Sequence, residues 1–192
     1  MSFLAELQAR KTKLKPTETI VTQQDGQKFI ETNSEFKKLD EVCEGFVVDT
    51  NPDDIPAQIF EHLYLGSQDC CELNILDKYL IRYVLSLGID APVKSPNVTY
   101  KFVKMLDLQS TNLHEFLPEC LHFIRQCLNS QSNVLVHCNA GVSRSASIVI
   151  AFLILDQHLP FEQAFAVVKK ARPCVRPNDG FMVQLRRLKK LG

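Results

Sequence analysis

Apolar positions recur along the chain in two different periods, and segments of the two kinds alternate. In one kind the apolar residues stand three or four positions apart, which is typical of one face of an α-helix. In the other kind, short runs of β-branched and aromatic residues predict strands. The helical period covers residues 68–79, 113–128, 143–156, 161–171 and 178–191, and the strand-like runs cover 59–65, 83–87, 100–106 and 133–137. Strands that alternate with helices predict an α/β fold, with a mainly parallel central sheet flanked by helices.

The first part of the chain has another pattern. Two β-branched runs, 17–22 and 28–32, flank Gln24-Asp25-Gly26, which is a signal for a β-hairpin. The acidic stretch that follows and reaches Asn51-Pro52 is typical of a linker. We therefore predict an N-terminal extension over residues 1–53 and one α/β domain over residues 54–192.

The composition narrows the classes of protein to which the chain can belong. Its 22 Lys and Arg residues balance 22 Asp and Glu residues, which argues against a general binder of nucleic acid or of anionic membranes. The longest mainly apolar stretch, residues 146–155 with Ser147 as its one polar member, is about half of the ~20 residues that a membrane span needs. The N-terminus lacks the pattern of a secretory signal. Seven cysteines without regular spacing match no disulfide framework, so we expect a reducing compartment, the cytoplasm and also the nucleus.

Charge is unevenly distributed along the sequence. Residues 39–77 contain ten acidic residues and no Lys or Arg, whereas residues 169–192 contain eight basic residues and one acid. Two interpretations stay open at this point. The segments are either solvated faces of opposite sign, or the basic segment belongs to a surface that attracts an anionic substrate.

One junction between a predicted strand and a predicted helix carries the candidate chemistry. Backbone amides that converge before a helix N-terminus form an anion site, and Gly141 gives that turn its conformational freedom. Arg144 can hold a phosphate through two parallel hydrogen bonds. Cys138, at the base of the same positive site, is favoured as a thiolate and stands in line for attack on phosphorus. The predicted substrate-binding residues are Asn139, Ala140, Gly141, Val142, Ser143 and Arg144.

The pattern His-Cys-x-x-Gly-x-x-Arg-Ser resembles the signature loop of the cysteine-based protein tyrosine phosphatase superfamily. Its form Asn-Ala-Gly-Val-Ser-Arg-Ser is similar to that of the dual-specificity branch. The resemblance to small atypical members extends over about residues 54–190, through the stretches 64–69, 106–108, 117–120, 171–173 and 177–182. It implies that Cys138 is the nucleophile and Arg144 the phosphate clamp. It also implies that Ser145 stabilises the departing thiolate and that His137 orders the loop.

A general acid must protonate the leaving oxygen and later activate water. Asp107 follows the strand predicted over residues 100–106, and the family's acid lies at the matching place, 31 residues before Cys138. Asp90 also follows a predicted strand and is the second candidate. The chain departs from many relatives at Ser86, where they carry Asn.

The resemblance implies a phosphatase that hydrolyses phosphotyrosine and phosphoserine or phosphothreonine through a phosphocysteine, with no metal and no cofactor. Its implied partners are phosphorylated proteins, namely mitogen-activated (stress-activated) protein kinases or their upstream kinases.

One alternative is an inositol-lipid phosphatase. Such enzymes tend to carry Lys in the loop, whereas positions 139, 140, 142 and 143 are neutral in this chain. The other is a non-catalytic phospho-binding scaffold of kinase cascades, which usually lacks the Cys or the Arg.

Overall fold

The computed structural model describes residues 19–22, 27–32, 35–42 and 53–188. The chain divides into two compact units, Met1–Cys43 and Glu44–Gly192. Each unit is a separate body with its own sheet.

The smaller unit contains an antiparallel sheet of three strands in the order β1-β2-β3. β1 (Thr19–Thr22) and β2 (Gln27–Thr32) are the two runs that flank the predicted turn, and the turn itself lies outside the described residues. β3 (Glu35–Val42) was not predicted. Its apolar residues Phe36, Leu39 and Val42 stand three apart, so the alternation that indicates a strand is missing from it. The predicted acidic linker lies mostly in residues 43–52, outside the described residues.

The larger unit is built on a sheet of five strands in the order β4-β5-β8-β6-β7. The edge strand β4 (Ala57–Phe60) pairs antiparallel with β5 (Leu63–Gly66). β5, β8 (Asn133–His137), β6 (Ile81–Leu87) and β7 (Thr99–Val103) are parallel, which confirms the predicted mainly parallel sheet. Strand β8 lies at the centre, and its apolar side chains are buried on both faces.

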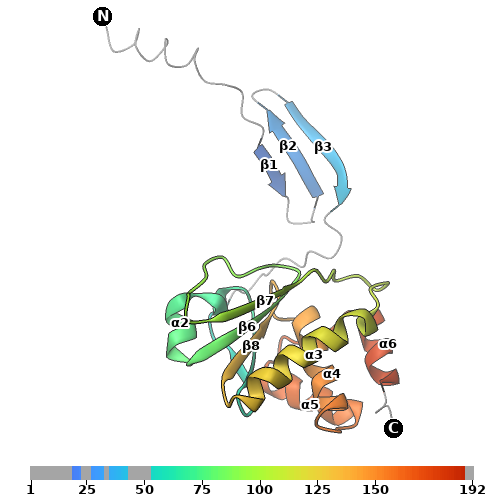
Figure 1. The fold of residues 1–192 in the computed structure, drawn as a ribbon. Coiled ribbons are helices and arrows are strands. Elements are labelled where there is room, and N and C mark those ends of the chain that lie inside the picture. The colour runs from blue at the N-terminus through green and yellow to red at the C-terminus, as the bar shows by residue number, and fades with distance from the viewer. Residues whose placement is uncertain (1–18, 23–26, 33–34, 43–52, 189–192) are drawn as a thin grey trace, which may run out of the picture. The chain divides into compact units, whose positions relative to one another are not determined.

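Helices cover both faces of this sheet (Figure 1). α2 (Leu73–Lys78) lies on one side, in the smaller of two apolar clusters together with Leu135 of β8. The larger cluster lies on the other face of the sheet and includes Val134 and Val136, the neighbours of Leu135 on β8. That side carries α3 (Leu113–Asn129), α4 (Arg144–Leu155), α5 (Phe161–Ala171) and α6 (Asp179–Arg187). The α4 helix contacts the sheet and the other three helices, so it forms the centre of this layer.

The α3 helix follows its predicted period closely. Cys120 and Cys127 lie on its buried face, and burial raises the pKa of each thiol to about 12. They are core residues, as the pattern indicates. Within the described part of the chain, no helix has the length and apolar character required to cross a membrane.

Two predicted elements differ in kind from the observed ones. The strand predicted over 59–65 is two strands joined by a turn at Glu61 and His62, whose φ of +62° ends β4. The helix predicted over 68–79 begins as a 3-10 turn, Asp69–Cys71, and α2 starts only at Leu73. The hydroxyl of Ser67, the residue just before this segment, donates to the carbonyl of Asp53 at 2.7 Å.

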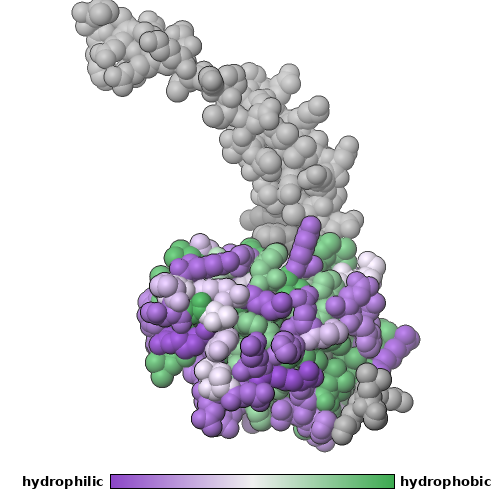
Figure 2. All heavy atoms as spheres, in the orientation of Figure 1, coloured by the Kyte–Doolittle hydropathy of each residue, from purple (hydrophilic) through white to green (hydrophobic). Residues whose placement is uncertain are grey.

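Apolar residues also reach the surface of the larger unit, between hydrophilic ones that spread across the face seen in Figure 2. The exposed large apolar side chains include Phe102, Leu106 and Val183. Single exposed apolar residues are usual on folded proteins and carry no function by themselves.

Candidate active site

The signature loop, residues 138–144, joins the carboxyl end of β8 to the first turn of α4. Each carbonyl from residue 138 to residue 142 accepts a hydrogen bond from protein outside the loop. Since a trans peptide group directs its N–H opposite to its C=O, the amides of residues 139–143 are directed to the loop interior. The donors to the five carbonyls, in order, are His137 Nδ1 (3.3 Å), the Gln68 amide (2.9 Å), Arg172 Nη2 (2.9 Å), Arg172 Nε (3.0 Å) and the Arg176 amide (2.9 Å). The loop therefore presents a ring of N–H donors to an anion.

Gly141 has the conformation that the sequence predicts for it. Its φ is +68°, in the region that favours glycine. A side chain at this position would also collide with the backbone of Gly66 and with the Arg172 guanidinium. The loop thus needs glycine here for both conformation and space.

The structure brings Cys138 and Ser145 together. Cys138 is only 2% exposed, and its Sγ lies 3.1 Å from the Ser145 hydroxyl. Ser145 is held in this place by the first turn of α4. A hydroxyl at this distance can donate to a thiolate, which is the contact predicted for the pair.

The guanidinium of Arg144 is buried and reaches the carboxyl end of β6. Its Nη1 donates to the Leu87 carbonyl at 3.1 Å, and Gly88 leaves room for it, because a Cβ there would collide with that nitrogen. Its Nε is buried and has no hydrogen-bond partner among the described residues. The nearest carboxylate oxygen, Asp107 Oδ2, is 3.9 Å away. A buried N–H without an acceptor is costly, and an anion held in the loop would supply the acceptor.

Asp107 lies four residues beyond the end of β7, with a side chain that is 3% exposed. Its Oδ1 accepts hydrogen bonds from the Ser143 hydroxyl at 2.6 Å and from Asn178 Nδ2 at 2.7 Å. The backbone N–H of Asn178 donates to the Ser143 hydroxyl oxygen at 3.1 Å, so the three residues form a closed group. The structure therefore joins Asp107 to the signature loop.

Asp90, the second candidate acid, has other partners. Its carboxylate pairs with Lys94 at 2.6 Å and accepts a hydrogen bond from the Ala91 amide at 2.9 Å. Burial acts to raise the pKa of Asp90, but these hydrogen bonds outweigh it and lower that pKa. A carboxyl group held in its ionised form by a neighbouring lysine is a poor proton donor.

His137 lies fully buried at the end of β8, where burial lowers its pKa to about 4. The ring is therefore neutral and carries one N–H. Because the Cys138 carbonyl can only accept, Nδ1 carries the hydrogen, and Nε2 accepts from the Ser86 hydroxyl at 2.7 Å. The Cys138 carbonyl thus fixes the tautomer, and Ser86, the residue that departs from many relatives, supplies the hydrogen bond to the other ring nitrogen.

Arg172 donates two hydrogen bonds to the signature loop, and the sequence analysis assigned it no role. Its buried guanidinium donates to the carbonyls of Ala140 and Gly141 and also forms a bidentate pair with Asp53, at 3.0 and 2.7 Å. Asp53 is the last residue that the sequence analysis assigns to the extension, yet it belongs to the larger unit, where Arg172 binds its carboxylate. The carboxylate of Asp53 and the side chain of Arg172 are 34% and 6% exposed.

Sequence signals existed for some of these residues but not for others. Arg172 and Asn178 lie in stretches 171–173 and 177–182, which carried the family resemblance without an assigned role. Asp53 gave no signal, since it is one of many acids in an acidic segment. Among the described residues, no group of three or more His, Cys, Asp or Glu side chains is arranged to hold a metal ion.

Comparisons with known proteins agree with this geometry. The family model "Dual specificity phosphatase, catalytic domain" matches residues 63–190. The chain therefore belongs to the dual specificity phosphatases, and this part of it is their catalytic domain. Within that family, dual specificity protein phosphatase 19 of Mus musculus is 43% identical over 145 residues. A probable dual specificity phosphatase of Dictyostelium discoideum is 33% identical over 222 residues, 96% of each chain.

The relatives differ in how much of their length this chain covers. It spans 66% of the mouse protein, with 74% of this chain matched, and 35% of human dual specificity protein phosphatase 9, with 68% matched at 40% identity. Among solved structures, DUSP15 has a TM-score of 0.64 at 30% identity, covering 68% of this chain and 85% of that one. Human DUSP28 has a TM-score of 0.67 at 25% identity, covering 73% and 95%.

Proposed function

We propose that this chain is a dual-specificity protein phosphatase that hydrolyses phosphotyrosine and phosphoserine or phosphothreonine through a phosphocysteine at Cys138. One observation carries the proposal. The buried Cys138 sulfur lies at the base of a loop whose carbonyls from residue 138 to residue 142 are all bound from outside, with the Ser145 hydroxyl 3.1 Å away. Such a loop has amide donors for the phosphate oxygens and a nucleophile beneath the phosphorus.

In the first step, the Cys138 thiolate attacks phosphorus and the bond from phosphorus to the leaving oxygen breaks. Asp107, in its protonated form, gives its proton to that oxygen, which leaves as an alcohol or a phenol. The Arg144 guanidinium, whose buried Nε has no partner in the described structure, donates to the phosphate oxygens through the reaction. Charge on the transferring group is thus stabilised by the amides and by Arg144.

In the second step, water attacks the phosphocysteine. The Asp107 carboxylate takes a proton from the water, the bond between sulfur and phosphorus breaks, and inorganic phosphate leaves. The sulfur departs as a thiolate, which accepts a hydrogen bond from Ser145. Ser143 and Asn178 hold Asp107 in place for both proton transfers, since both donate to its Oδ1.

The substrates that we propose are phosphorylated proteins of mitogen-activated, stress-activated kinase signalling, acted on in the cytoplasm and also in the nucleus. Two observations support this choice over a lipid headgroup. The variable loop positions are neutral, and the motifs resemble the atypical enzyme called stress-activated protein kinase pathway-regulating phosphatase. The likeness to dual specificity protein phosphatase 19 agrees with that resemblance.

A panel of substrates tests the proposal directly. It contains an aryl phosphate, phosphopeptides with one phosphotyrosine or one phosphothreonine, doubly phosphorylated Thr-x-Tyr peptides and inositol lipids. We expect the phosphopeptides and the aryl phosphate to be hydrolysed with chelator present, and the Cys138→Ser variant to bind them without turnover. If only the lipids were hydrolysed, the substrate would be a lipid and not a protein. If the unmodified chain bound the phosphopeptides without turnover, the non-catalytic scaffold would be favoured.

A further inference from the structure

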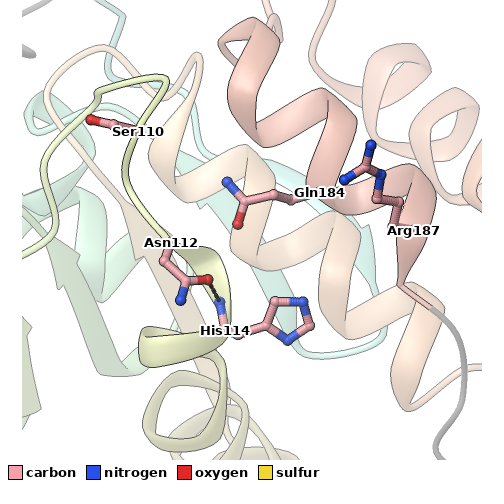
Figure 3. A pocket seen from close by; sticks show the side chains of 5 residues that line it. All are labelled: Ser110, Asn112, His114, Gln184 and Arg187. Atoms are coloured by element: carbon pink, nitrogen blue, oxygen red, sulfur yellow. Dashed lines mark hydrogen bonds between the residues drawn. The ribbon is translucent and has the colours of Figure 1, made fainter.

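A polar hollow lies between α6 and the segment that leads from Asp107 into the first turn of α3. Its volume is about 350 Å³, and it is lined by Ser110, Asn112, His114, Gln184 and Arg187 (Figure 3). None of these five side chains is acidic. Glu115, the acid nearest to it in sequence, lines a neighbouring hollow instead and accepts a hydrogen bond from Asn112 at 3.1 Å.

The framework of this hollow is held by its two amide side chains. Gln184 accepts from the Leu113 amide and donates to the Thr111 carbonyl, each at 2.8 Å, which ties α6 to the start of α3. Asn112 caps α3 through the His114 amide at 3.2 Å. Both amide groups are therefore used within the protein, so the walls of the hollow are defined before any ligand binds.

The remaining three side chains are available to a ligand. The hydroxyl of Ser110, the ring of His114 and the guanidinium of Arg187 have no hydrogen-bond or ion-pair partner within the described part of the chain. A guanidinium matches the two oxygens of a carboxylate or a phosphate, and a hydroxyl and an imidazole N–H can donate to the same oxygens. A hollow with one fixed positive charge and two further donors, and no acid among its lining residues, suits an anionic group.

The position of the hollow along α6 gives its distance from Asn178, which contacts both Asp107 and Ser143 of the signature loop. Asn178, which donates to Asp107, precedes this helix, and Gln184 and Arg187 lie six and nine residues further on. At 1.5 Å per helical residue, these positions are about 9 and 14 Å along the axis. An extended peptide covers the same distance in about three to four residues, at roughly 3.3 Å each.

We infer that this hollow is a second anion subsite, which binds an acidic or phosphorylated side chain of the substrate three to four residues from the phosphorylated residue held at Cys138. The inference rests on the proposed function and adds to it a rule for the choice of substrate. Carboxylate and phosphate share the chemistry that Arg187 recognises, so the experiment must separate them.

Peptides with one phosphotyrosine and a variable residue at a distance of three or four, on either side, provide the test. The variable residue is Glu, Gln, Ser or phosphoserine, and kcat/KM is measured for each peptide. We expect the unmodified protein to favour Glu over Gln, and phosphoserine over Ser, by roughly 5- to 10-fold, the range of an exposed charge-assisted hydrogen bond. Arg187→Ala should bring both ratios near one.

Arg186→Ala is the matched control. It removes the same charge one residue away, from a side chain that lies over the Phe161 ring at 5.2 Å. It should leave both ratios unchanged, and both variants should hydrolyse a small aryl phosphate as the unmodified protein does. Equal loss of preference in the two variants would show a general effect of charge and overturn the subsite, as would ratios near one in the unmodified protein.

Binding separates this inference from the proposed function. The same peptides are titrated against Cys138→Ser, alone and combined with Arg187→Ala, so that Kd is measured without turnover. The expected preference for Glu and phosphoserine, lost with Arg187, supports the subsite even if no hydrolysis occurs. Hydrolysis of the aryl phosphate without any preference in kcat/KM or Kd would refute the subsite and leave the phosphatase activity standing.

Discussion

The pair between Arg172 and Asp53 provides the most direct test of how the signature loop is held. In Asp53→Asn, the carboxylate is lost while the size of the side chain is kept. Breaking a buried ion pair typically costs about 3–5 kcal/mol, because one charge stays buried without its partner. Asp53 is 34% exposed, so water takes over part of its role, and we expect a loss of about 2 kcal/mol.

The loss should appear in stability and in turnover. For a folded unit of this size, about 2 kcal/mol corresponds to a fall in Tm of roughly 4–8 °C, measured by calorimetry. Arg172 also donates to the carbonyls of Ala140 and Gly141, so a guanidinium free to move lets the loop relax. We expect kcat on an aryl phosphate to fall on the order of tenfold, since small displacements in a catalytic loop are costly.

Asp54→Asn is the matched control, because it makes the same chemical change at the exposed neighbouring residue. It should leave both Tm and kcat near those of the unmodified protein. If Asp53→Asn behaves like Asp54→Asn, the ion pair does not support the loop. A fall in Tm with unchanged kcat would show that the pair stabilises the fold without shaping the loop.

Three further changes test single groups of the site. Asp107→Asn should lower kcat about 100-fold or more for alkyl phosphates, and less for aryl phosphates with good leaving groups. It should also remove the limb of the pH profile that reports deprotonation of the acid, whereas Asp90→Asn should have neither effect. The reverse result would assign the acid to Asp90. Ser145→Ala should slow hydrolysis of the phosphocysteine more than its formation, so rapid mixing should show a burst of product near one equivalent. Normal turnover, or equal slowing of both steps, would show that Ser145 has only a structural role. His137 binds its proton more weakly in the folded state, where its pKa is about 4, than in the unfolded state, where it is about 6.5. The contribution of the neutral His137 ring to the free energy of unfolding is therefore fully present above pH 6.5, and about 3 kcal/mol of it is lost as the pH falls from 6.5 to 4. NMR titration of the ring should show a midpoint near pH 4. A midpoint near 6.5 would contradict burial of the neutral form.

Much of the fold and the core of the candidate site could be predicted from short stretches of sequence. The period of residues 113–128 predicts α3 because burial of one helical face depends only on residues three and four apart. The run 133–137 predicts β8 in the same way, from its nearly continuous apolar residues. Cys138, Arg144 and Ser145 could be predicted because one loop and one helical turn carry all three, so the local backbone brings them together.

The partners that hold these residues were decided only by the tertiary structure. Asp107 meets Asn178, His137 meets Ser86, and Arg172 meets Asp53. Members of these pairs stand 71, 51 and 119 positions apart in the chain. No local period relates residues at such separations. They meet because parallel strands end at a common edge of the sheet, while the helices between them pack on its faces and return the chain to that edge.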